Sequence, residues 1–223
     1  MKQLAMALLA EGKTDHQFIR IVAQRTAERV LNLNCPVTTE VLDPIIFEES
    51  GGKQADRILG VAHSAFGFHL ILIHADADSR TSESAWSDRI EPGFQLIHDA
   101  KKKGEKVCEQ VVPVIPVQMT EAWMLADPEA LIETIGFNGL PAELGLPPRP
   151  RLVEGIADPK SSLKEVISTA VSTRPRRRRR ELSISQLYEP LAGRIELEFL
   201  AQVPAYQRFQ SDLKRTLSEL SFF

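Results

Sequence analysis

The clearest sign of the fold class is an apolar run that ends in acids, Phe68-His69-Leu70-Ile71-Leu72-Ile73-His74-Ala75-Asp76-Ala77-Asp78. The run is too short to span a membrane, and it is apolar enough for a strand that is buried on both faces. Such strands form parallel sheets covered by helices, and ligands bind at the carboxyl ends of those strands. Asp76 and Asp78 therefore lie where the sequence predicts a ligand site.

A further acid follows the first predicted strand, Leu4-Ala5-Met6-Ala7-Leu8-Leu9-Ala10-Glu11-Gly12. Because parallel strands end at a common edge of the sheet, we expect Glu11, Asp76 and Asp78 to converge there. Mg²⁺ prefers oxygen ligands and needs only one or two carboxylates beside a substrate phosphate. Any one of these acids alone would more simply cap a helix, where negative charge suits the N-terminal dipole. The three together favour a metal site.

The N-terminal half alternates strand-like and helix-like segments, which predicts an α/β fold with a mostly parallel sheet flanked by helices. The expected strands are 3–10, 37–47, 68–76 and 107–117, and the expected helices are 14–31, 52–65 and 86–103. After Val117 the pattern becomes helical, with a short helix over 120–127 and another that starts at Ser161 or Ser162. We therefore expect a metal-binding α/β domain over residues 1–127 and a helical C-terminal appendage over 128–223.

The charge of the chain is unevenly distributed. A net charge of -3 and a pI of about 6.0 do not describe a uniformly basic nucleic-acid binder. Positive charge is concentrated in the segment 174–180, which could contact nucleic-acid phosphates or an acidic partner through a run of arginines. These are Arg176, Arg177, Arg178, Arg179 and Arg180. A solvated loop is an equally open alternative, because like charges in a run repel one another.

The cysteine content and the hydropathy of the chain bear on its location. The two cysteines, Cys35 and Cys108, are too few and too far apart for a disulfide framework or a zinc site. Such low use of cysteine agrees with a reducing compartment. The sequence contains neither an apolar stretch as long as a bilayer span nor the pattern of a signal peptide. We therefore expect a cytoplasmic protein with no membrane partner.

Three segments carry a family resemblance: Ala10-Glu11-Gly12-Lys13-Thr14-Asp15-His16-Gln17-Phe18-Ile19, Val117-Gln118-Met119-Thr120-Glu121-Ala122-Trp123-Met124-Leu125-Ala126-Asp127, and Asp158-Pro159-Lys160. With the order of the acids, the chain resembles a Toprim domain, the metal-binding module of topoisomerases, DnaG-type primases and nucleases of the overcoming-lysogenization-defect group. The three segments look like the prokaryotic Toprim-like family catalogued as domain of unknown function 4276. The resemblance implies that Glu11, Asp76 and Asp78 are the metal ligands.

The resemblance implies roles for two more residues. Glu121 would supply a fourth carboxylate to a second metal position or bind the attacking water, although a place at the start of a short helix explains it equally well. Lys160 is similar to the lysine that stabilises charge at the scissile phosphate in the lysogenization-defect nucleases. A lysine near a helix start is not favoured by the helix dipole, so an external reason for it is worth testing. We expect Trp123 and Met124 in the core.

These observations favour a Mg²⁺- or Mn²⁺-dependent nuclease that hydrolyses phosphodiester bonds of DNA or RNA. The resemblance also implies an ABC- or AAA-type ATPase partner in an anti-phage defence system, and the chain has no Walker A sequence of its own. One alternative is a catalytically weak Toprim-like binding or regulatory subunit of an ATPase complex. Another is a phosphotransferase or phosphatase, although those enzymes usually place an Asp where this chain has Glu11. Assembly into a homo-oligomer stays open.

Overall fold

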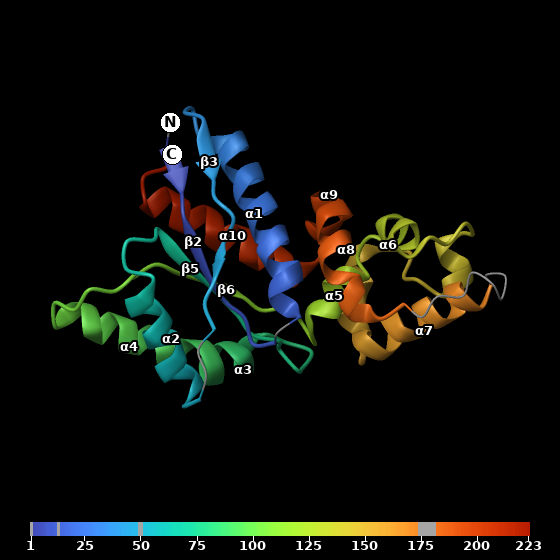
Figure 1. Cartoon of the computed structure of the whole chain (residues 1–223), viewed down its shortest axis with the longest axis horizontal. Helices are drawn as coiled ribbons and strands as arrows, with labels where there is room; N and C mark the ends of the chain where they lie inside the picture. The colour runs from blue at the N-terminus through green and yellow to red at the C-terminus, as the bar shows by residue number, and fades with distance from the viewer. Residues whose placement is uncertain (1, 13, 49–50, 174–181) are drawn as a thin grey trace.

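The computed structural model describes residues 2–12, 14–48, 51–173 and 182–223 (Figure 1). Its strands are β1 (Lys2–Leu4), β2 (Met6–Leu9), β3 (Thr39–Val41), β4 (Ile45–Ile46), β5 (Leu70–His74) and β6 (Val111–Val114). Its α-helices are α1 (Asp15–Asn34), α2 (Gln54–Ser64), α3 (Glu83–Ala85), α4 (Glu91–Lys102), α5 (Thr120–Met124), α6 (Pro128–Ile135), α7 (Pro159–Ser172), α8 (Tyr188–Arg194), α9 (Leu197–Leu200) and α10 (Pro204–Glu219). A π-helical turn, Trp86–Ile90, joins α3 to α4, and 3₁₀ turns cover Pro141–Leu144, Pro150–Gly155 and Ile184–Gln186. The predicted α/β class and helical C-terminal region are confirmed.

The order of the strands locates a ligand crevice. All paired strands are parallel, in the order β4-β2-β5-β6, and β1 pairs separately with β3. The chain passes from β2 to β4 on one side and then to β5 on the other side of β2. In open parallel sheets this reversal marks a switch point, where ligands bind outside the carboxyl ends of the two central strands. Here those strands are β2 and β5.

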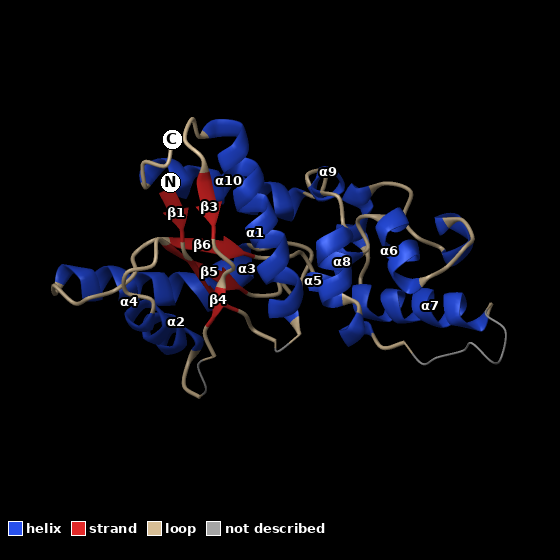
Figure 2. Ribbon diagram, turned by 45° about the horizontal axis from the view of Figure 1, so that its top comes forward, coloured by secondary structure: helices blue, strands red, loops and turns tan. Residues whose placement is uncertain are grey.

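Helices cover both faces of the sheet (Figures 1 and 2). Alternate strand residues such as Leu8 and Leu72 join one buried cluster with residues of α1 and α10. Their neighbours, such as Ile71 and Ile73, join a second cluster with residues of α2 and α4. The helix α10 comes from the far end of the chain and packs against β6 and α1. The predicted domain boundary at residue 127 stays a prediction.

The predicted strand over 37–47 is wrong as a single element. It forms two short strands, with Leu42 donating its N–H to the Leu4 carbonyl and Phe47 to the Leu8 carbonyl. Pro44 lies between them and has no N–H to donate to a ladder, so the pairing is interrupted there. The last predicted strand is shorter than expected, and it tolerates Pro113 because β6 lies at an edge of the sheet.

The predicted helix over 86–103 begins earlier and contains a π-helical turn. α3 starts at Glu83, and the π turn ends at Ile90, two residues before Pro92, which cannot donate the N–H of a regular helix. The helix α7 also begins before the expected serines, because Asp158 caps it by accepting a hydrogen bond from the Ser161 N–H at 2.8 Å. No helix within the described ranges is long and apolar enough to cross a membrane.

Candidate acidic site at the sheet edge

Glu11 and Asp76 follow β2 and β5 at the switch point. The backbone N–H of Asp76 lies 3.3 Å from Glu11 Oε2, so the two turns are in direct contact. Gly12 allows the first helix to begin close by, since a Cβ there would lie only 2.2 Å from Asp15 Oδ2. The Glu-Gly pair therefore combines an acid at the strand end with a residue that leaves room for the carboxylate of Asp15 in its present position.

Arg89 bridges the acidic residues at this edge. Its Nη1 lies 3.0 Å from both Glu11 Oε2 and the Asp76 carbonyl oxygen, and its Nη2 lies 2.6 Å from Asp78 Oδ2. The hydrogen bond to Asp78 raises the pKa of Arg89 and outweighs the opposing effect of partial burial. The guanidinium thus provides the positive charge between the acids. Nothing in the sequence marked Arg89, because its position depends on the π-helical turn.

Asp78 adopts a backbone conformation that is uncommon for a residue with a side chain. Its φ is 49°, and the facing residue Gln118 has a φ of 61°. The Asp78 N–H donates to the Gln118 carbonyl at 2.9 Å, which extends the pairing beyond the ends of β5 and β6. Left-handed non-glycine residues cost free energy and cluster at functional sites. This turn holds the Asp78 carboxylate against Arg89. The two-residue spacing of Asp76 and Asp78 in the sequence does not by itself require this contact.

The carboxylate of Asp76 contacts Thr120 and His74. Its Oδ1 accepts hydrogen bonds from the Thr120 N–H at 2.8 Å and the Thr120 hydroxyl at 3.3 Å, and it lies 3.3 Å from His74 Nε2. Burial lowers the pKa of His74, but the hydrogen bond and the charge of Asp76 outweigh it, so the net pKa is raised. His74 is fully buried, and its Nε2 is hydrogen-bonded to the Thr120 hydroxyl.

Glu121 and Lys160 form a second group. Glu121 is only 2% exposed, and its Oε1 accepts a hydrogen bond from the Tyr188 hydroxyl at 2.7 Å and lies 3.2 Å from Lys160 Nζ. The hydrogen bond to Glu121 and its charge raise the pKa of Lys160. Burial first, and then the hydrogen bond to Glu121, raise the pKa of Tyr188. A buried carboxylate is costly unless it is paired, and this one has two partners.

Asp15, in the first turn of α1, is close enough to both groups for their charges to act on it. Burial raises its pKa; the charge of His74 opposes this, while those of Asp76 and Glu121 add to it. Asp15 was not predicted as a site residue. The signal that could have revealed it is its place three residues after Gly12, inside the segment that carries the family resemblance.

The structure brings Glu11, Asp76 and Asp78 to one edge of the sheet, with the pair of Glu121 and Lys160 beside them. Glu11 and Asp78 are 43% and 55% exposed and Asp76 is 21% exposed, so ions and substrates can reach them. As the side chains stand, no three His, Cys, Asp or Glu residues in the described part of the chain are arranged to hold a metal ion. The predicted contacts Arg176, Arg177, Arg178, Arg179 and Arg180 lie outside the described residues.

Together, the fold and the site define an α/β protein with acidic residues at the switch point of a parallel sheet. The family model described as "Domain of unknown function (DUF4276)" matches residues 10–217, and the chain belongs to this family. Comparisons with curated proteins and with solved structures gave no match. The wider relationship to Toprim domains stays a prediction.

Proposed function

We propose that this protein is a divalent-metal-dependent nuclease that hydrolyses phosphodiester bonds in DNA or RNA. The observation that carries the proposal is that Glu11, Asp76 and Asp78 lie at the switch point, where Arg89 pairs with the carboxylates of Glu11 and Asp78 and with the backbone carbonyl of Asp76. The position is where open parallel sheets bind ligands. The resemblance to Toprim nucleases supports the same assignment.

The chemistry of the side chains fits Mg²⁺ or Mn²⁺. Glu11, Asp76 and Asp78 offer carboxylate oxygens, which these hard cations prefer. The Arg89 guanidinium already bridges Glu11 and Asp78, so a divalent cation would have to displace it from these carboxylates. When bound, such an ion activates water and neutralises the charge that develops on the scissile phosphate. Arg89 would then exchange a carboxylate for a phosphate, since a guanidinium pairs with either.

The other residues have roles that follow from their surroundings. Glu11 is exposed enough to take a proton from an attacking water. Asp76 is held by Thr120 and His74, so its carboxylate has a fixed direction. Lys160 is half exposed and paired with Glu121, and its charge would stabilise the transition state of the phosphate. Glu121 acts here by positioning Lys160, in place of the second-metal role that the resemblance implied.

A second candidate function is a binding or regulatory subunit with little turnover. The ion pairs of Arg89 favour it, because they already neutralise Glu11 and Asp78 without any metal. In that case the acids would stabilise the turn after β5, and nucleic acid would bind without being cleaved.

The two candidates differ in one measurable property, which is metal-dependent cleavage. We expect the wild-type protein to cleave DNA or RNA in Mg²⁺ or Mn²⁺ and to stop when a chelator is added. Glu11→Gln should abolish cleavage, since the amide cannot take up a proton or bind a cation as a carboxylate does. Asp88→Asn is the matched control, because Asp88 is an exposed acid on the turn of Arg89 and accepts a hydrogen bond from the Ser87 hydroxyl. Full cleavage by Glu11→Gln would exclude the mechanism, and metal-independent binding without cleavage would favour the regulatory subunit.

We further propose that an ABC- or AAA-type ATPase partner in a cytoplasmic anti-phage system restrains this nuclease. The chain has no Walker A sequence, so the partner would supply ATP hydrolysis. A constitutive nuclease would damage its own host, which makes restraint physically reasonable. Purification from the native host should recover the ATPase together with this chain, as checked by mass spectrometry. Recovery of a free chain, monomeric or homo-oligomeric, with full cleavage activity would rule out this arrangement.

A further inference from the structure

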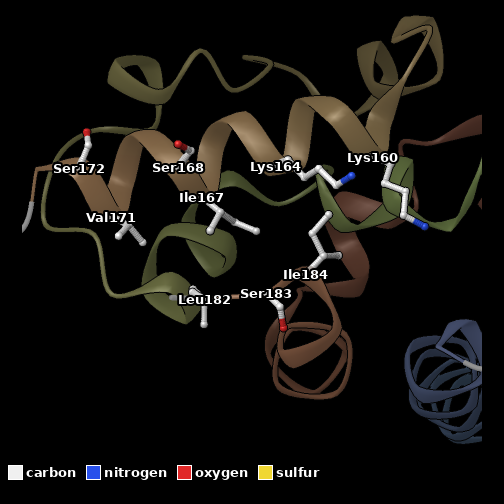
Figure 3. Close-up of a pocket in the computed structure, with 9 residues that line it drawn as sticks. All are labelled: Lys160, Lys164, Ile167, Ser168, Val171, Ser172, Leu182, Ser183 and Ile184. Carbon is white, nitrogen blue, oxygen red and sulfur yellow. The ribbon is translucent and has the colours of Figure 1, made fainter. Parts of the chain in front are cut away.

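A pocket of about 570 Å³ opens between α7 and the segment that follows residue 181 (Figure 3). Its volume is within the usual range of small-molecule sites, roughly 300–1,000 Å³. The residues that matter here are Lys160, Lys164, Ile167, Val171, Leu182 and Ile184. They come from two separate stretches of the C-terminal region, so the pocket depends on the packing between these stretches.

The pocket has aliphatic walls and a cationic end. Figure 3 shows Ile167 and Val171 pointing from α7 across the gap toward Leu182 and Ile184. The side chains of Lys160 and Lys164 lie together at one end. A ligand that matches this pattern has a flat or apolar part and an anionic group attached to it. A nucleotide has both parts, and aliphatic side chains can contact the face of any base.

The cationic end of the pocket faces the acidic site. Lys160 Nζ lies 3.2 Å from Glu121 Oε1. Beyond Glu121, the charges of Asp15 and Asp76 also raise the pKa of Lys160, so the lysine is within electrostatic range of both. A phosphate held at this end would therefore lie toward the carboxylates at the end of β5. Lys160 thus belongs both to the pocket and to the proposed site of cleavage.

We propose that this pocket binds one unpaired nucleotide of the substrate strand, with the base between the aliphatic walls and a phosphate on Lys160 and Lys164. The inference rests on the proposed function and adds the class of substrate. A base in a duplex is stacked and paired, and it enters such a pocket only if it is flipped out at a cost of a few kcal/mol. The preferred substrate is therefore a single strand, a loop or a frayed end.

The chain between the two walls is consistent with an anionic ligand. Arg174 and Arg176–Arg180 lie in the sequence between Thr173 and Leu182, although they are outside the described residues. Because these arginines lie in the sequence between the two stretches that form the pocket walls, their positive charge favours a polyanion over an uncharged apolar ligand.

The test measures binding without cleavage, in a chelator, by fluorescence anisotropy of a labelled ten-nucleotide single strand. Val171→Trp fills the gap between the walls, and we expect its Kd to rise about 10-fold, the size of one lost base contact. Thr169→Trp is the matched control, because Thr169 is an exposed residue of the same helix that does not line the pocket. Its Kd should equal that of the wild type. A blunt duplex of the same length should bind the wild type more weakly than the single strand.

A charge variant keeps the test valid if the tryptophan disturbs the fold. Lys164 is exposed, so Lys164→Gln should leave the fold intact, weaken single-strand binding and lower the slope of log Kd against log salt by about one. Lys214→Gln, an exposed lysine on α10, should change neither. Equal binding by the wild type and both pocket variants would overturn the proposal, and so would equal binding of duplex and single strand.

Further outcomes separate this inference from the proposed function. If the wild type cleaves nucleic acid in Mg²⁺ but the pocket variants bind normally, the pocket proposal fails and the nuclease stands. If the pocket variants lose binding but no metal supports cleavage, the nuclease fails and the nucleotide pocket stands. Binding of laurate that is lost in Val171→Trp, with single-strand binding unchanged, would assign the pocket to a lipid and overturn the proposal.

Discussion

Replacement of Trp123 by alanine is expected to lower the free energy of unfolding by about 3–5 kcal/mol. Trp123 is fully buried in α5, and its ring centroid lies 5.4 Å from that of Tyr206 and 6.3 Å from that of Phe209, both in α10. These contacts join the segment after β6 to the last helix of the chain. Deleting the ring removes apolar burial and leaves a cavity that the rigid neighbours cannot fill. Urea unfolding monitored by circular dichroism measures the change.

Trp123→Phe is the informative comparison for this prediction. Trp123 Nε1 is buried and has no hydrogen-bond partner among the described residues. The phenylalanine variant removes this unsatisfied N–H while it keeps most of the aromatic contact, so its loss of stability should be clearly smaller. A loss below about 1 kcal/mol in the alanine variant would show that the site collapses around the missing ring and that α10 is held by other contacts.

The sequence predicted the fold class because strands and helices each follow a local hydrophobic period. The run before Asp76 was buried on both faces as expected, and Trp123 and Met124 lie in the core. The interruption of the predicted strand over 37–47 was missed, although Pro44 was a readable signal. The return of α10 to the sheet could not be predicted, because it depends on contacts between residues that are far apart in the chain.

The candidate site was predicted only in part, because some of its residues follow strands and others are placed by tertiary packing. Glu11, Asp76 and Asp78 follow strands, and parallel strands bring their carboxyl ends together. Arg89 was missed because a π-helical turn, and not a motif, places its guanidinium among the acids. The role of Tyr188 was also missed: its hydroxyl donates a hydrogen bond to the buried Glu121 carboxylate. Such partners are set by tertiary packing and leave no local pattern.

Asp76→Asn is expected to reduce metal-dependent cleavage by at least about 100-fold, because even residues that only support metal ligands typically cost 10–100-fold. The amide oxygen of asparagine can still accept the hydrogen bond that the Thr120 N–H now donates to Asp76 Oδ1. The second oxygen becomes an NH₂ group, which cannot bind a cation, and the negative charge is lost. The backbone carbonyl of Asp76, which Arg89 contacts, is unchanged. The variant therefore separates the charge of this residue from its support of the turn.

The measurement is the single-turnover cleavage rate in Mg²⁺ and in Mn²⁺, together with the melting temperature. Asp99→Asn is the matched control, since Asp99 is an exposed acid on α4 away from the strand ends, and its cleavage rate should equal that of the wild type. A folded Asp76→Asn protein that cleaves at the wild-type rate would remove Asp76 from the chemistry. If the variant loses cleavage only because its melting temperature falls sharply, the role of Asp76 would be to stabilise the fold through its contacts with Thr120 and His74. Because asparagine keeps the Thr120 contact, we expect the fold to survive and the loss to follow the missing charge.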